Sequence, residues 1–438
     1  MHKSPSRGAG LGPSIPAILL FLCASVGPVG AQLVPASTTA LGMGGNHAAV
    51  ARGLAALGVN PANLGLSDNP GWSLAIPVLG GMQGLEPITL GDLLSADGDL
   101  LPDEKKDAWL EEIRRAGGQT GLGRAELTGL AISVGPVAFQ VHGQAFMEAS
   151  LSPFASELIL FRDSWATRPL PTDLDLAGSR ADGSGVTTFA LGAGFPVAED
   201  LFGLGDERLA LGASLTYSMG NGVFLARDPQ GLVDAGSPLA LLAFPILQTD
   251  EEDYQFNGGS GVGLDLGVGW QAGPWGVSAS LANVFNTFDW DLDALAYYPG
   301  EVVVGSGGVS LDYEKRPAQQ APQVLLDELD GLRFKPRMTI GTRWDATETV
   351  TLAADVQHRF GEGLPLGPPT RAGVGLDLQV IPQLSLQTGL TYVTDGVRAG
   401  MGAALTLGPF NLGGAYQLQR GSVGDSQLAA LGISFNTR

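Results

Sequence analysis

The stretch VTLAADVQHRF, residues 350–360, decides the fold of this chain. Apolar side chains such as Leu352 and Val356 alternate in it with polar side chains such as Asp355 and Arg359. Neighbouring side chains of a β-strand point to opposite faces, so one face of this strand is apolar and the other polar. Such a strand suits a wall with lipid on one side and water on the other, as in a membrane-spanning β-barrel.

About a dozen more stretches along the chain have the same alternation. We therefore predict an all-β fold, a transmembrane antiparallel barrel of about fourteen strands. The expected strands are 72–80, 124–134, 137–148, 186–196, 207–219, 260–271, 275–286, 335–345, 349–360, 370–380, 384–394, 397–407, 410–419 and 427–436.

The connections between these strands alternate in length through most of the chain. Short links lie at 135–136, 272–274, 345–348, 381–383 and 408–409, and long ones at 81–123, 149–185, 220–259 and 287–334. Bacterial outer-membrane barrels have short periplasmic turns and longer outer loops. The pattern therefore places both chain ends in the periplasm, with 395–396 as the one unusually short outer link.

Composition agrees with a barrel. Charged residues make up 16% of the 438 residues, against about 25% in soluble domains. Glycine is abundant, at 65 residues. Beyond the N-terminus no run of about 18 apolar residues occurs, so transmembrane helices are not expected. The formal net charge is −20, which argues against nucleic-acid binding, since phosphate contacts need clustered Lys and Arg.

Residues 1–31 are expected to be a secretory signal peptide. Lys3 and Arg7 give it a positive start, an apolar stretch follows, and small residues precede a cut after Ala31. The alternative is a lipoprotein signal that uses Cys23, the single cysteine. Cleavage after Ala31 removes that cysteine, so no disulfide is expected in the mature chain.

Aromatic residues gather where the barrel would meet the membrane interface. Trp72, Trp270, Trp275 and Trp344 all lie beside strand ends at the predicted periplasmic side. The last strand places alternate apolar residues outward and ends near Phe435, and it resembles the signal that outer-membrane assembly machinery recognises. Outer-membrane lipid and that machinery are therefore expected partners.

Two of the long outer loops contain helix signals. Asp103 is expected to cap a helix that runs to Ala116 and stops at Gly117. A second helix is expected from Pro322 to Asp330. The apolar clusters 239–247 and 292–298 also lie in predicted outer loops. They either expose capture surfaces for a hydrophobic molecule or pack against each other as a cap.

The segment after the signal carries the motifs LGMGG (41–45), AAVARGL (48–54) and NPANL (60–64). It resembles the N-terminus of FadL/TodX-type outer-membrane transporters and of PorV-like barrels, and is most similar to uncharacterised FadL-like members. The resemblance implies fourteen strands and a segment, 32–70, that plugs the barrel (71–438) as a hatch. It implies hatch roles for Gly42, Met43, Gly44, Gly45, Asn60, Pro61, Ala62 and Asn63.

Charged residues also fall on the predicted inner face of the strands. They are Asp265, Arg343, Asp355, Arg359, Arg371 and Asp377. Opposite charges on neighbouring strands can pair across a sheet, which predicts a polar network in the lumen. A more specific alternative is a row of charged side chains that guides a substrate, in which Arg343 or Arg371 holds a carboxylate head group.

Signals for catalysis are weak, and we expect no enzyme, no cofactor and no metal. The mature chain offers His47, His142 and His358, and no nucleophile can be paired with them. Neither a Gly-x-Ser-x-Gly nor a His-Glu-x-x-His motif occurs. The alternating acids at 289, 291 and 293 resemble a calcium loop, but the later glycine and glutamate of that loop are missing.

The sequence thus predicts a monomeric outer-membrane barrel that takes up small hydrophobic or amphipathic molecules, such as fatty acids, by passive passage. The alternative is a PorV-like barrel that serves protein secretion or surface attachment and binds a partner protein. A general open porin fits poorly with a plug.

Overall fold

The computed structural model describes residues 37–94, 101–161, 176–227, 240–305, 308–365, 367–394, 396–421 and 424–436. The expected signal peptide lies outside them. Among the described residues, none of the helices combines the length and the apolar character needed to cross a bilayer.

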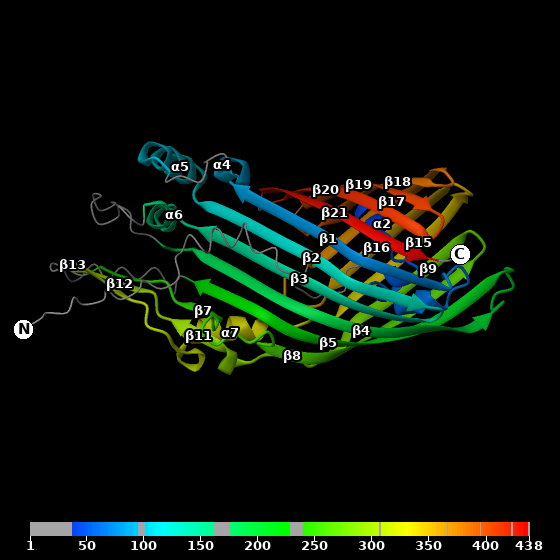
Figure 1. Cartoon of the computed structure of the whole chain (residues 1–438), viewed down its shortest axis with the longest axis horizontal. Coiled ribbons are helices and arrows are strands. Elements are labelled where there is room, and N and C mark those ends of the chain that lie inside the picture. The colour runs from blue at the N-terminus through cyan, green and yellow to red at the C-terminus, as the bar shows by residue number, and fades with distance from the viewer. Residues whose placement is uncertain are drawn as a thin grey trace, which may run out of the picture.

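The described residues form a closed barrel of fourteen antiparallel strands (Figure 1). Each strand pairs with the next along the wall, and the last strand pairs with the first to close the ring. In wall order the strands are β1 (Trp72–Glu86), β2 (Gln119–Val134), β3 (Val137–Leu151), β4 (Arg180–Glu199), β5 (Glu207–Arg227), β8 (Gly259–Ala272), β9 (Trp275–Asn286), β15 (Arg337–Thr347), β16 (Val350–Arg359), β17 (Thr370–Ile381), β18 (Leu384–Val393), β19 (Gly396–Leu407), β20 (Phe410–Gly421) and β21 (Gly424–Asn436).

All fourteen expected strands are present, and the main difference is their length at the loop end. The β4 strand begins at Arg180 and β5 continues to Arg227, whereas the alternation predicts 186–196 and 207–219. The added residues lie beyond the apolar band, where neither face needs to meet lipid. Two-residue alternation therefore no longer marks the strand there.

The outward face of the wall is apolar, as expected for a surface in lipid. Leu215 is 64% exposed and Leu431 is 71% exposed. At the end of the barrel with the short turns, Trp275 and Trp344 stack with ring centroids 5.5 Å apart. The short turn at Gly135 needs a positive φ of 53°, which glycine adopts without strain.

At the opposite end the long loops carry further structure (Figure 1). The helices there are α4 (Leu90–Leu94), α5 (Asp103–Ala116), α6 (Pro153–Leu160), η3 (Leu292–Ala294), η4 (Ala318–Gln320) and α7 (Gln323–Gly331). The short strands are β6 (Ala240–Ala243), β7 (Ile246–Thr249), β10 (Asp289–Trp290), β11 (Leu295–Tyr298), β12 (Glu301–Gly305), β13 (Gly308–Asp312) and β14 (Arg316–Pro317).

Both predicted loop helices are present, with one correction at a cap. The α5 helix ends at Gly117 in the left-handed conformation, as predicted. Its N-cap is Pro102, however, and Asp103 is the first helical residue rather than the cap. A carboxylate in the first turn still interacts favourably with the helix dipole.

The apolar loop segments form a cap rather than exposed capture surfaces. Strand β7 pairs with β11, and Leu247 and Leu295 between them are only 0% and 4% exposed. They belong to a buried cluster with Phe288, Trp290 and Leu325 of α7. Of the two alternatives that the sequence leaves open, packing as a cap is therefore the one that the described residues adopt.

Candidate functional site

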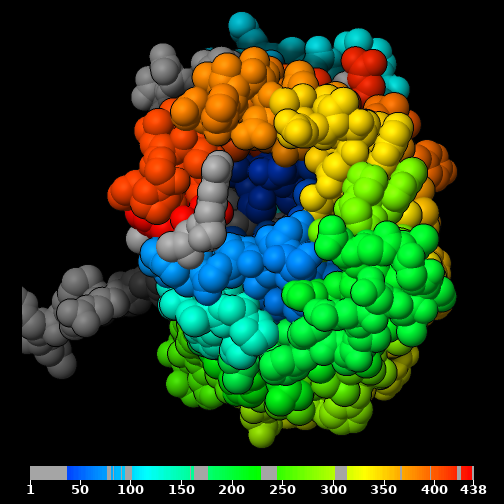
Figure 2. Space-filling model, turned by 90° about the vertical axis from the view of Figure 1, so that its right-hand side faces the viewer, coloured from blue at the N-terminus to red at the C-terminus, as the bar shows by residue number. Residues whose placement is uncertain are grey.

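The N-terminal segment, which we define as residues 37–70, lies inside the barrel. Figure 2 looks into the end of the barrel with the short turns and shows its dark-blue atoms within the ring of strands. The segment contains the helices α2 (Thr38–Gly42) and α3 (Leu54–Leu57) and the 3-10 helix η1 (Pro61–Gly65). Asn46, Asn60 and Asn63 are completely buried in it.

The first motif of the segment contacts strands β17 and β18. Gly44 and Gly45 have φ values of 69° and 93°, so this tight turn requires glycine. The Gly45 carbonyl accepts a hydrogen bond from Arg371 Nη1 at 2.7 Å. Asn46 donates to Thr391 Oγ1 at 2.7 Å and to the Val374 carbonyl at 3.1 Å. The turn is thereby tied to two neighbouring strands of the wall.

A second tie holds the residues just after this turn. One oxygen of Asp355, on β16, accepts the backbone N–H groups of His47 at 2.7 Å and Ala48 at 2.9 Å. The carboxylate is 2% exposed. A charged acceptor makes stronger hydrogen bonds than a neutral one, so this contact is among the strongest between the segment and the wall.

The Asn-Pro-Ala-Asn motif makes the third tie. Asn60 Nδ2 donates to Ser278 Oγ at 2.7 Å and to the Val268 carbonyl at 2.8 Å, while its own Oδ1 accepts Ala62 N. Asn63 Nδ2 donates back within the segment, to the Ala48 carbonyl at 2.8 Å. Asn60 thus both caps η1 and binds the wall, with Pro61 as the first residue of η1.

Glycines of the wall make room for the backbone of the segment. A Cβ on Gly389 would lie 2.1 Å from the Met43 carbonyl oxygen, and a Cβ on Gly212 would lie 2.3 Å from Ala62 N. Real Cβ atoms do not approach backbone atoms so closely. These wall positions therefore admit the segment only because they carry no side chain.

The charged residues expected to form one lumen network are distributed over separate groups. Arg343 pairs with Asp345 and with Asp68 of the N-terminal segment. Arg371 donates to Gln357, directly opposite, as well as to the segment. The other members have the following partners: Asp265 accepts from Asn283 N and Ser214 Oγ, Arg359 donates to the Leu364 carbonyl, and Asp377 accepts from Gln387.

A cavity of about 110 Å³ lies between the segment and the loops. It is lined by residues Leu41, Gly45 and Val59 of the segment, and by four arginines of the wall. They are Arg124 of β2, Arg337 of β15, Arg371 of β17 and Arg398 of β19. We call this space the arginine cavity.

Only Arg371 of these four arginines is among the candidate residues that the sequence singles out. The same alternation contains the missing signal, because Arg337 lies six residues before Arg343 in β15 and therefore shares its inward parity. The alternation cannot show that strands far apart in the sequence, such as β2 and β19, face one cavity.

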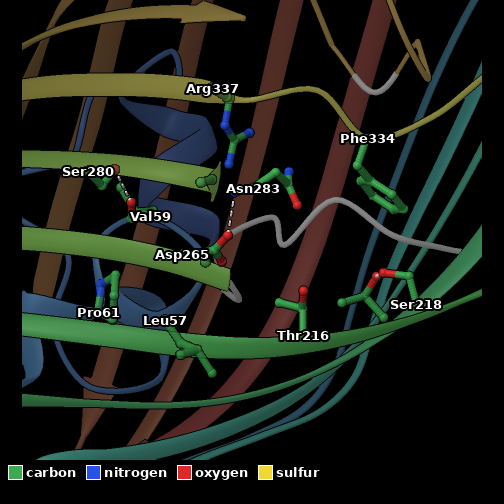
Figure 3. A pocket seen from close by; sticks show the side chains of 13 residues that line it. Leu57, Val59, Pro61, Thr216, Ser218, Asp265, Ser280, Asn283, Phe334 and Arg337 are labelled. Carbon is green, nitrogen blue, oxygen red and sulfur yellow. Dashed lines mark hydrogen bonds between the residues drawn. The ribbon is translucent and has the colours of Figure 1, made fainter. Parts of the chain in front are cut away.

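A second, smaller cavity adjoins the first (Figure 3). Leu57, Val59 and Pro61 of the segment line it together with Asp265, Asn283 and Arg337 of the wall. Figure 3 shows Asp265 bonded to the Asn283 backbone, with Arg337 above them. Phe334, which lies edge-on to Phe288 of the cap at 5.2 Å, also lines this cavity and so joins it to the apolar cap.

The histidines and the alternating acids do not form a catalytic or metal centre. His142 Nδ1 is 3.1 Å from Thr128 Oγ1 on the neighbouring strand, and His358 is exposed beside Thr370. Asp291 accepts Asp293 N as the cap of η3, and Asp289 pairs with Arg333. Among the described residues no group of three or more His, Cys, Asp or Glu side chains is arranged to hold a metal.

The burial of His47 predicts that the stability of the seated N-terminal segment depends on pH. Burial lowers the pKa of His47 to about 4, so the seated segment keeps it neutral while a released segment titrates near 6.5. Release therefore takes up a proton, and we expect the seated state to lose stability as the pH falls from about 6.5 to 4. The protection factors of the 46–51 amides in detergent, which correct for the slower intrinsic exchange at low pH, should fall over this range.

The control for this pH effect is His47→Gln, which cannot titrate. It should reduce the difference in the protection of these amides between pH 6.5 and pH 5. An unchanged pH dependence in His47→Gln would contradict a role for His47.

The geometry defines a class of protein: a closed fourteen-stranded outer-membrane barrel with a chain segment seated in its lumen. No family model matches the sequence, and no curated protein matches it. Solved structures do. The chain has the FadL-type outer-membrane barrel fold, as the sequence motifs predict.

Three solved structures illustrate the likeness. The toluene transporter TbuX of Ralstonia pickettii is 14% identical, with 93% of this chain and 100% of that chain covered and a TM-score of 0.52. A TodX deletion mutant, described as a monoaromatic hydrocarbon channel, is 11% identical over 93% and 100%, with a TM-score of 0.54. A FadL homologue of Pseudomonas aeruginosa is 12% identical over 94% and 100%, with a TM-score of 0.50.

Proposed function

We propose that this protein is a passive outer-membrane channel for small hydrophobic or amphipathic molecules, fatty acids among them. The observation that carries the proposal is the buried segment, which occupies the lumen and is held by hydrogen bonds rather than by covalent links. The transporters and hydrocarbon channels that share the fold support the same conclusion and agree with the expectation that the chain is not an enzyme.

In this proposal residues 32–70 act as the hatch and 71–438 as the channel. In the hatch, the tight turn under Arg371 and Asn46 is formed by Gly42, Met43, Gly44 and Gly45. The η1 helix is held against β8 and β9 by Asn60, Pro61, Ala62 and Asn63. Most of these ties are side-chain hydrogen bonds, each of which contributes about 0.5–3 kcal/mol, so the hatch can be displaced without breaking a covalent bond.

The proposed route of the transported molecule begins at the cap and follows the apolar residues that lead into the barrel. Phe334 connects the buried cap cluster to the smaller cavity, where Leu57 and Val59 of the hatch form the floor. Val59 also lines the arginine cavity, so a molecule above the hatch contacts apolar and cationic groups at once. This combination suits an amphipathic molecule with its polar end toward the arginines.

A reversible disulfide lock tests whether the hatch must move. The Cβ of Ala62 lies 3.7 Å from the position of a Cβ on Gly269 of β8, close to the usual separation in a disulfide. The oxidised Ala62→Cys/Gly269→Cys protein should therefore lose most uptake of dodecanoate and toluene into cells that lack other routes. Reduction should restore it, because the predicted mature chain has no other cysteine.

The single variants Ala62→Cys and Gly269→Cys are the matched controls, since neither can form the lock. They should keep their uptake under oxidising conditions. Uptake that is equal in the oxidised and reduced double variant would contradict a moving hatch, and no uptake by the unmodified protein would contradict the channel itself.

Two further partners remain predictions. Recognition of the β21 strand by outer-membrane assembly machinery is expected from its outward Leu431 and Ile433. The alternative role in secretion or surface attachment predicts that a large partner protein co-purifies with the barrel in mild detergent. Purification of the barrel without such a partner would favour the channel.

A further inference from the structure

The arginine cavity holds more positive charge than the residues lining it neutralise. Of the lining residues, four are arginines and one, Glu126, is a carboxylate. Glu126 already accepts a hydrogen bond from Gln144 at 3.1 Å. Burying cations with too few anionic partners is unfavourable, so a surplus of arginines over carboxylates favours the binding of an anion.

The hydrogen bonds of the arginines lead to the same conclusion. Arg398 donates to the Gln419 amide oxygen at 2.8 Å, and Arg124 donates to the Pro365 carbonyl at 3.2 Å. Arg371 donates to the Gly45 carbonyl and to Gln357. These acceptors are all neutral, and Arg124 Nε is buried with no partner among the described residues.

Two other carboxylates act electrostatically on arginines of this cavity, Asp355 on Arg371 and Asp265 on Arg337. Asp355 accepts two backbone amides of the hatch, and Asp265 accepts Asn283 N and Ser214 Oγ on the side of the smaller cavity. Arg337 lines both cavities, so part of its charge faces Asp265. Arg124 and Arg398 share the carboxylate of Glu126, so two cations face one anion on this side of the cavity.

The arginines also approach the cavity from several sides. Strands β2, β15, β17 and β19 each contribute one guanidinium group, while a planar carboxylate is satisfied by a single bidentate arginine. A phosphate monoester offers three terminal oxygens and up to two charges. The cavity, about 110 Å³, far exceeds the roughly 10–15 Å³ that one water needs.

We propose that the arginine cavity binds the phosphate group of an amphiphile, with the alkyl chain against the apolar residues of the hatch and cap. This inference rests on the proposed channel function and narrows its substrate class. Leu41, Val59 and Leu428 line the same cavity and provide the apolar contact for the first carbons of the chain.

The test compares four probes on the full mature chain in detergent, measured by calorimetry and native mass spectrometry. Decyl phosphate should bind at least about 10-fold more tightly than decanoate, and decanol should bind weakest. Inorganic phosphate should compete at higher concentration if the head group supplies most of the affinity. Because a phosphate monoester takes up a proton near pH 6, decyl phosphate should bind more weakly at pH 5.5 than at 7.5, and the difference should persist in His47→Gln, which lacks the titrating histidine of the cavity.

The key variant is Arg398→Gln, which removes a charge whose hydrogen bonds lead to Gln419 and not to the hatch. This substitution should weaken the binding of decyl phosphate by about 10-fold or more. The matched control is Arg208→Gln, which removes a charge paired with Glu199 at the short-turn end and should leave binding unchanged. Arg124→Gln serves as a second variant if Arg398→Gln fails to fold, with heat-modifiable gel migration as the folding check.

Equal affinity for decanoate and decyl phosphate, or an unchanged affinity in both arginine variants, would overturn the phosphate site while leaving hydrocarbon and fatty-acid uptake intact. Binding of inorganic phosphate as tight as that of decyl phosphate would instead assign the site to a free anion and overturn the amphiphile. Loss of toluene uptake alone would count against the channel and not against this site.

Discussion

Replacing Asp355 with alanine is expected to convert a closed barrel into one that opens frequently. The substitution leaves the buried amides of His47 and Ala48 without their acceptor, and each unpaired group costs about 1–3 kcal/mol. Each 1.4 kcal/mol changes a population about tenfold, so the unseated hatch should become roughly 100-fold more populated. Single-channel recording in planar bilayers should show this as more frequent and longer conducting events.

Asp377→Ala is the matched control for this experiment. Asp377 is an inward-facing carboxylate on the neighbouring strand β17, but its partner is Gln387 of the wall rather than an amide of the hatch. It should leave the barrel as closed as the unmodified protein. A barrel that conducts equally rarely in Asp355→Ala would contradict the view that this carboxylate holds the hatch.

The second large effect is expected from a single added methyl group, in Gly212→Ala. Its Cβ would lie 2.3 Å from Ala62 N and 2.4 Å from the Pro61 carbonyl carbon, both backbone atoms that cannot rotate away. Overpacking of this kind costs about 1–3 kcal/mol or more. The η1 turn should therefore be displaced, and the amides of 62–66 should exchange hydrogen much faster while the strands stay protected.

Gly222→Ala adds the same methyl group to the same strand, β5, away from the hatch. The added Cβ would meet Thr249 Oγ1 at an ordinary contact distance of 3.6 Å. Hydrogen exchange in η1 should not change in this variant. Equal exchange in Gly212→Ala and Gly222→Ala would show that the hatch does not depend on close approach to the wall.

The wall of the barrel could be predicted from the sequence because lipid imposes a rule on every strand. Outward positions such as Leu352 and Val356 must be apolar, whereas their neighbours can be polar. Apolar and polar residues therefore alternate along each strand with a period of two. The short turns at 135–136 and 408–409 could be predicted for a similar reason, since few residues tolerate the required backbone angles.

The loops and the arginine cavity follow no such rule. Outside the bilayer, Leu247 and Leu295 are apolar because they pack against each other, and nothing local indicates which partner each will find. Arg124 and Arg398 are separated by most of the chain, and only closure of the ring brings them to one cavity. The Asn-Pro-Ala-Asn motif could be noticed, but not that Asn60 would bond to β8 and β9.

The glycines that seat the hatch have a consequence for the cell that carries this protein. Positions such as Gly212 and Gly389 contribute no side chain to the bore, so the hatch alone fills the space beside them. Damage to the hatch would then widen the bore at these positions, whatever the natural cargo. Natural selection should consequently preserve the hatch as part of the permeability barrier, independently of any need for the cargo.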